Sequence, residues 1–211
     1  MNAYDDFVCY LIPHPLSDSD LSTHPVQPPA HINPHKPLHH LTTMDPTLYK
    51  YPSPLEGWES SEPLSDERNP DGKSLQNPPS ITLSEAYTEF IDPLAKDDRG
   101  AFDAHIYFLH TDERETAFAR ALHERVRREF PELRVYPLHQ HPIGPHPVGM
   151  FEVNLFTPPQ FGAFVSWLVI HRGPLSVLLH PNTGDAMRDH TQRAIWMGER
   201  YPLQTGPLRG E

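Results

Sequence analysis

The chain has 211 residues, a formal net charge of −11 at pH 7 and one cysteine, Cys9. The lack of a basic run excludes charge-driven binding of nucleic acid or of an anionic membrane surface, and the single cysteine excludes an intramolecular disulfide framework. The longest apolar stretch, near residues 164–170, is far shorter than the ~20 residues that cross a membrane, so we expect a cytoplasmic protein.

Proline and charge are distributed unevenly along the chain. Residues 1–100 contain 15 of the 26 prolines and carry 16 acidic against 6 basic residues. An acidic, proline-rich segment buries too little apolar surface to offset the entropy that is lost on ordering it. We therefore expect residues 1–100 to form a mostly disordered arm, with a short helix near residues 82–90 capped by Ser84 or Thr82, and residues 101–205 to form one folded domain.

Regular patterning begins at residue 102. Apolar and polar residues alternate over residues 102–108 (FDAHIYF), which predicts a strand with one apolar face and one polar face. The pair Asp112 and Glu115 is typical of a helix start, and apolar residues then recur at helical spacing until Pro131. This segment is predicted to be an amphipathic helix that covers one face of a sheet.

The remainder of the domain repeats strand and helix signals. Strands are predicted over residues 133–138, 150–156 and 175–180. A second helix is bracketed by Thr157 as its cap and Gly173 just beyond its end. A short third helix is predicted after the last strand, with Asp185 as its cap and with one face made of Met187, His190, Ala194 and Met197.

The resulting element order, βαββαβ, matches the ferredoxin-like α+β fold, in which two helices cover one face of a four-stranded antiparallel sheet. In that topology the first strand lies between the third and the fourth, so His105 is expected to approach His180. The face without helices is predicted to present His105, Tyr107, Glu152, Asn154, Ser176 and His180. Because such a sheet face needs a covering surface, we expect a homodimer.

Imidazoles on short strands and stiff loops suit a divalent metal with open coordination positions. His105 and His180 share the polar face, and His146 stands between Pro145 and Pro147, which restrict its backbone. The third donor could be His146 or Glu152. The competing interpretation is that these histidines are hydrogen-bonded sheet residues without a metal.

Three motifs, in this order along the chain, resemble the DOPA 4,5-dioxygenase family of fungi and bacteria. They are FDAHIYF at residues 102–108, PIGPHPVGMFEV at residues 142–153, and LSVLLHPNTGDAMRDH followed by AIWMG at residues 175–198. The resemblance implies a small, often dimeric, ferredoxin-like enzyme that uses ferrous iron (Fe2+) and O2. The implied reaction is extradiol ring cleavage of a catechol such as L-DOPA.

Carried over to this chain, the resemblance makes His105, His146 and His180 the candidate metal ligands. His190 is the candidate acid or base, with Glu152 as a neighbour or substitute ligand and Tyr107 as a further catalytic candidate. Asn154 and Asn182 are the expected substrate-binding residues. The alternative function is a non-enzymatic ferredoxin-like dimer that binds a small aromatic ligand on its open sheet face, which would hold no stoichiometric iron.

Overall fold

The structure is a computed structural model that describes residues 52–91, 94 and 100–209. Within residues 52–91, regular structure amounts to the 3-10 helix η2 (Glu85–Tyr87) and an isolated bridge between Arg68 and Leu75. Ser84 caps η2 by accepting from the backbone N–H of Ala86. The rest of the predicted arm lies outside the described residues, so its disorder stays a prediction.

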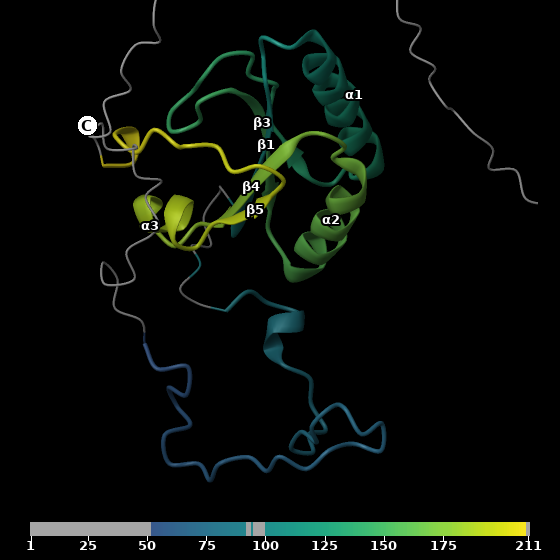
Figure 1. The fold of residues 1–211 in the computed structure, drawn as a ribbon, viewed down its shortest axis with the longest axis vertical. Helices are drawn as coiled ribbons and strands as arrows, with labels where there is room; N and C mark the ends of the chain where they lie inside the picture. The colour runs from purple at the N-terminus through teal and green to yellow at the C-terminus, as the bar shows by residue number, and fades with distance from the viewer. Residues whose placement is uncertain (1–51, 92–93, 95–99, 210–211) are drawn as a thin grey trace, which may run out of the picture. The chain divides into compact units, whose positions relative to one another are not determined.

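The domain has the predicted α+β order with one additional strand (Figure 1). All neighbouring strands of its sheet are antiparallel, in the order β2-β3-β1-β4-β5. The sheet therefore has five strands rather than the four predicted. Its elements are β1 (Phe102–Phe108), α1 (Glu113–Glu129), β2 (Arg134–Val135), β3 (Gly149–Leu155), α2 (Pro158–His171), β4 (Ser176–Pro181), α3 (Ala186–Thr191), β5 (Ile195–Met197) and the 3-10 helix η3 (Pro207–Arg209).

Local signals set both long helices. The Asp112 carboxylate accepts from the N–H groups of Arg114 and Glu115, which satisfies two of the free donors at the start of α1. The Thr157 hydroxyl oxygen caps α2 by accepting from the backbone N–H of Gln160, and Pro158 occupies the first helical position. None of the helices in the described part of the chain is long and apolar enough to cross a membrane.

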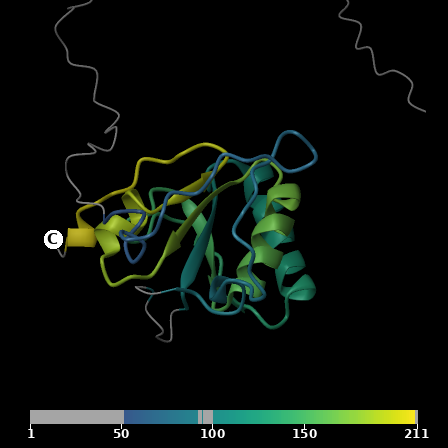
Figure 2. The same cartoon turned by 90° about the horizontal axis from the view of Figure 1, so that it is seen from below.

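The main core lies between the sheet and the two long helices (Figures 1 and 2). Both α1 and α2 pack on the same face, as predicted, and the alternating apolar residues of β1, β3 and β4 point toward them. The fully buried members of this core include Ala104, Ile106, Phe108, Phe151, Val153, Leu155, Val177, Ala119, Val126, Phe164 and Leu168.

The opposite face of the sheet is not bare, which corrects the prediction. A second cluster centred on Tyr107, Met150 and Leu178 is covered by the chain's own C-terminal segment and by the residue that precedes β3. The covering side chains are those of Val148, Ala194, Trp196, Tyr201 and Leu203. Because the chain itself covers this part of the sheet, a homodimer no longer follows from an uncovered face, and it stays a prediction.

The additional strand replaces part of the predicted third helix. Helix α3 ends at Thr191, and residues 195–197 pair with β4 as β5, so Ala194 and Met197 do not extend a helical face. The second strand is shorter than the predicted residues 133–138. It ends at Val135 because Pro137 has no N–H to continue the ladder, although Tyr136 still donates to the Glu152 carbonyl.

Gly149, at the start of β3, lies against a ring of the core. A Cβ built on Gly149 would be 2.6 Å from Cζ of Phe108, whose side chain is fully buried. We expect Gly149→Ala to lower the free energy of unfolding by about 1–3 kcal/mol, because the buried ring has to move. Urea denaturation of the two proteins measures the difference. Gly162→Ala, on α2 with nothing within 4 Å of the new Cβ, is the control, and equal losses would contradict the packing argument.

Candidate active site

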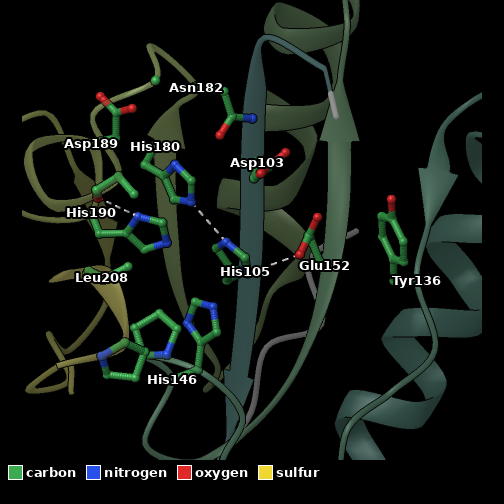
Figure 3. Close-up of a pocket in the computed structure, with 14 residues that line it drawn as sticks. Asp103, His105, Tyr136, His146, Glu152, His180, Asn182, Asp189, His190 and Leu208 are labelled. Atoms are coloured by element: carbon green, nitrogen blue, oxygen red, sulfur yellow. Dashed lines mark hydrogen bonds and ion pairs between the residues drawn. The ribbon is translucent and has the colours of Figure 1, made fainter. Parts of the chain in front are cut away.

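A pocket of about 590 Å³ opens on the sheet face opposite α1 and α2 (Figure 3). Strands β1, β3 and β4 form its floor, and the loop before β3, helix α3 and η3 form its walls. The lining residues are Asp103, His105, Tyr136, Pro145, His146, Glu152, His180, Asn182, Gly184, Ala186, Asp189, His190, Pro207 and Leu208. Three sequence-distant segments therefore meet over the polar face of the sheet.

Four histidines converge in this pocket. Nε2 of His105 lies 3.0 Å from Nε2 of His180, so the two strands do bring these residues together. The ring of His146 is 4.2 Å from that of His105, and the ring of His190 is 3.9 Å from that of His180, measured between centroids. His190 thus faces the sheet, as its place on α3 predicts.

A tight turn presents His146. The backbone groups of Ile143 and His146 bond each other in both directions, at 3.1 and 2.9 Å. Gly144 has a φ of +54°, a conformation that L side chains rarely adopt, and this allows the two-residue turn. The Pro145 carbonyl accepts from the N–H of Gln204, so the C-terminal segment also holds this loop.

Backbone carbonyls orient two of the four rings. Nδ1–H of His180 donates to the Pro181 carbonyl at 2.9 Å, and Nδ1–H of His190 donates to the Ala186 carbonyl at 2.9 Å. A carbonyl can only accept, so in each neutral ring the other nitrogen, Nε2, carries a lone pair. Both residues therefore present Nε2 as a metal ligand or as a base.

His105 and His180 have the geometry of a metal-binding pair. The 3.0 Å between their Nε2 atoms is a hydrogen-bond distance in the metal-free protein. The same distance suits two ligands of one metal, because two bonds of about 2.1 Å at a right angle separate their nitrogens by about 3.0 Å. The other nitrogen of His105 is buried without a hydrogen bond, and its nearest carboxylate oxygen, on Glu152, is 3.8 Å away. The donor set suits a divalent ion such as iron, zinc or manganese.

Two carboxylates stand beside the histidines. The amide of Asn154 donates to Oδ1 of Asp103 at 2.6 Å and to Oε1 of Glu152 at 2.8 Å. Asn154 is fully buried, so its amide holds the two carboxylates in place, and its predicted contact with substrate stays a prediction. Asp103 was not among the predicted site residues, although it shares the polar face of β1 with His105.

Among the residues that the structure describes, two overlapping groups of side chains could hold a metal. One consists of His105, His146 and His190, and the other of Asp103, His105 and His180. Within each group the donor atoms lie within 4.8 Å of one another. Only His105 belongs to both, which makes it the centre of the site.

Burial favours the uncharged form of three of these rings. It lowers the pKa of His105 and of His180, and it lowers the pKa of His146 to about 3, with neighbouring histidines acting in the same direction on His105 and His146. Burial also raises the pKa of Tyr107, whose hydroxyl lies 2.7 Å from Nδ1 of His146. At neutral pH the site therefore offers neutral imidazoles, the form that binds metal.

These pKa shifts predict a pH-dependent stability for the metal-free protein. The folded pKa values of His105, His146 and His180 lie below the unfolded value near 6.5, so the unfolded chain binds more protons. Stability is full above pH 6.5 and falls below it, by up to about 1.4 kcal/mol per pH unit for each histidine. Urea denaturation at pH 7.5, 6.5 and 5.5 measures this slope. A His146→Gln protein with the wild-type slope would contradict the contribution of that ring.

The other pocket residues have local anchors. Helix α3 is fixed by the buried Asp189, which accepts from the N–H and hydroxyl of Thr183 and pairs with Arg193 at 2.8 Å. Asn182 lines the pocket, and its amide donates to the Gly100 carbonyl at 3.2 Å. Pro207 and Leu208 were not predicted, because they come from a segment without periodicity, where a sequence carries no signal of a shared cavity. Tyr136 lies in the predicted second strand, but a strand pattern does not indicate which cavity its residues line.

The chain is similar to known proteins and matches one family model. The model of the Dopa 4,5-dioxygenase family matches residues 102–206. An uncharacterized 21.2 kDa protein of Botryotinia fuckeliana is 60% identical over 166 residues, which are 75% of this chain and 91% of that protein. A DOPA 4,5-dioxygenase of Amanita muscaria is 42% identical over 48 residues, 23% of this chain and 21% of that enzyme.

A solved structure is also similar. It is the crystal structure of a candidate dioxygenase from Nostoc punctiforme, with 38% sequence identity and a TM-score of 0.48. The similarity covers 53% of this chain and 92% of the Nostoc chain. The family that the three motifs predict is thus confirmed by the family match and by the partial match to the Amanita enzyme.

Proposed function

Because this chain belongs to the Dopa 4,5-dioxygenase family, which points to a dioxygenase, we propose that it is a non-haem iron enzyme that opens the ring of a catechol at an extradiol bond. The observation that carries the proposal is the pair of Nε2 atoms on His105 and His180, 3.0 Å apart in an open pocket. The Amanita relative's name supports L-DOPA as the first catechol to test.

His105 and His180 would hold the metal, together with one further donor from the pocket. Ferrous iron suits this donor set, and when bound it would supply a Lewis acid that positions the catechol oxygens and O2. The pocket residues then have separate tasks. They bind the ring, orient its hydroxyl groups and remove a proton.

His190 is the proposed base. Its Nδ1–H is committed to the Ala186 carbonyl, so in the neutral ring the lone pair is on Nε2, which would accept a proton from a catechol hydroxyl. Its ring stands beside His180, so the proton would be removed next to the metal-binding pair.

The walls of the pocket suit an aromatic ring. Leu208 of η3 lies on the side of His190, and Tyr136 stands beyond Glu152 on the opposite side (Figure 3). Pro207 adds further apolar surface to the lining. Tyr107, a predicted catalytic residue, is fully buried behind His146 and contacts it through its hydroxyl, so it acts through that ring. A pocket with apolar walls and a few convergent polar groups is typical of sites for small molecules, which supports a small aromatic substrate such as a catechol.

Anaerobic reconstitution with Fe2+, followed by addition of L-DOPA and O2, tests the function. We expect uptake of one O2 per catechol and a yellow ring-opened product in the absorbance scan. Protein treated with a chelator and kept metal-free is the control. Iron-loaded protein that consumes no O2 with L-DOPA or with other catechols would contradict the proposal and favour the non-enzymatic alternative.

A further inference from the structure

We infer that Asp103 is the third metal ligand beside His105 and His180, and that His146 instead donates a hydrogen bond from Nε2 into the pocket. The inference rests on the metal site of the proposed function. It replaces both predicted candidates for the third position, His146 and Glu152.

The strand register places Asp103 at the metal-binding pair. Asp103 and His105 are two residues apart on β1, so both side chains point to the same face. His180 is the direct partner of Asp103 across the β1 and β4 pairing. Donor atoms of the three residues lie within 4.8 Å of one another, and Figure 3 shows the side chains at the corners of a triangle with His146 below it.

Charge favours the carboxylate. A divalent cation held by neutral imidazoles alone would keep its full charge in a buried site, which is costly. Asp103 is 6% exposed and would offset part of that charge. Two histidines and one carboxylate also form the ligand set typical of non-haem ferrous oxygenases, and they leave positions open for substrate and O2.

Asn154 supports Asp103 in this role. Its amide donates to Oδ1 of Asp103 at 2.6 Å, so one carboxylate oxygen has a fixed orientation. Metal-binding carboxylates in proteins are commonly held by such hydrogen bonds. All the residues involved come from three adjacent strands, which hold their positions more rigidly than a loop or a short helix.

The contact between Tyr107 and His146 argues against His146 as a ligand. The Tyr107 hydroxyl is fully buried, and leaving its O–H without an acceptor would be costly. The hydrogen-bond partner that the structure gives it is Nδ1 of His146, at 2.7 Å. If the hydroxyl donates there, the proton of the neutral imidazole is on Nε2. A protonated nitrogen donates a hydrogen bond and cannot coordinate a metal.

Glu152 lies beside Nδ1 of His105, away from the Nε2 that faces His180, so it does not complete a metal site with that nitrogen. Its Oε2 is 3.8 Å from Nδ1, whereas the nitrogen that faces His180 is Nε2. Its Oε1 accepts from the same Asn154 amide group that orients Asp103. Glu152 therefore adds negative charge behind the His105 ring without entering the triangle.

Titration of the full-length, metal-free protein with Co2+, followed by the d–d absorption of the bound ion, tests the ligand assignment. We expect Asp103→Ala and Asp103→Asn to weaken Co2+ binding at least 100-fold, and His146→Gln and Glu152→Gln to change it less than 10-fold. Circular dichroism verifies the fold, and Asp103→Asn provides the answer if the alanine variant does not fold. Wild-type affinity in both Asp103 variants, or loss of binding in His146→Gln, would overturn the assignment.

NMR of 15N-labelled protein tests the role of His146. In the metal-free wild type we expect the proton of that ring on Nε2, and in Tyr107→Phe we expect it to shift toward Nδ1. A wild-type ring protonated only on Nδ1 would overturn this part of the inference. These readouts do not involve turnover, so a protein that binds Co2+ as expected but consumes no O2 would contradict the proposed function and leave the ligands assigned.

Discussion

Replacing His180 by alanine will abolish iron binding and turnover and will leave the fold largely intact. His180 supplies one of the two Nε2 atoms that lie 3.0 Å apart, and the Pro181 carbonyl holds its Nδ1, which fixes the direction of that donor. Changing a residue that only hydrogen-bonds to a ligand weakens metal affinity by about 10- to 100-fold, and losing the ligand itself should weaken it more. Metal content after anaerobic Fe2+ reconstitution and O2 uptake with L-DOPA measure the two losses.

The control for this experiment is His141→Ala. His141 lies in the loop that carries His146, but it is exposed and does not line the pocket. We expect it to retain stoichiometric iron and full activity, and circular dichroism should show native secondary structure in both variants. A fully active His180→Ala protein would refute the ligand assignment.

Replacing His190 by glutamine will separate catalysis from metal binding. Since His190 is proposed to accept a proton through Nε2, its loss should lower kcat by about 100- to 10,000-fold, the usual contribution of a general base. Iron content should stay that of the wild type, because His190 lies outside the triangle of Asp103, His105 and His180. Steady-state O2 uptake and metal analysis of the same preparation give both values.

The pH profile distinguishes a base from a merely structural residue. In the variant, kcat should rise more steeply with pH than in the wild type, because ionisation of the catechol in solution replaces removal of the proton by the enzyme. His141→Gln, the same substitution on an exposed histidine, should leave the profile unchanged. Loss of iron in His190→Gln would instead make His190 a ligand, and an unchanged kcat would remove it from the mechanism.

The sequence alone determined the layers of the fold and the centre of the site. Alternation over residues 102–108 and 175–180 assigns each side chain to a face, because successive side chains of a strand point in opposite directions. The order of elements then places the first strand between the third and the fourth. The sequence therefore predicts that His105 and His180, which are 75 positions apart, lie close together.

The tertiary structure decided the features that have no local signal. Strand β5 has three residues, too few to show a period, and it forms because β4 offers an unpaired edge. The bond between Tyr107 and His146 joins residues 39 positions apart, one on a strand and one on a turn. The placement of Asp103 beside His105 and His180 depends on its hydrogen bond with Asn154 and on the register of β1 with β4. Periodicity reports which way a side chain points, but only packing decides which side chain it meets.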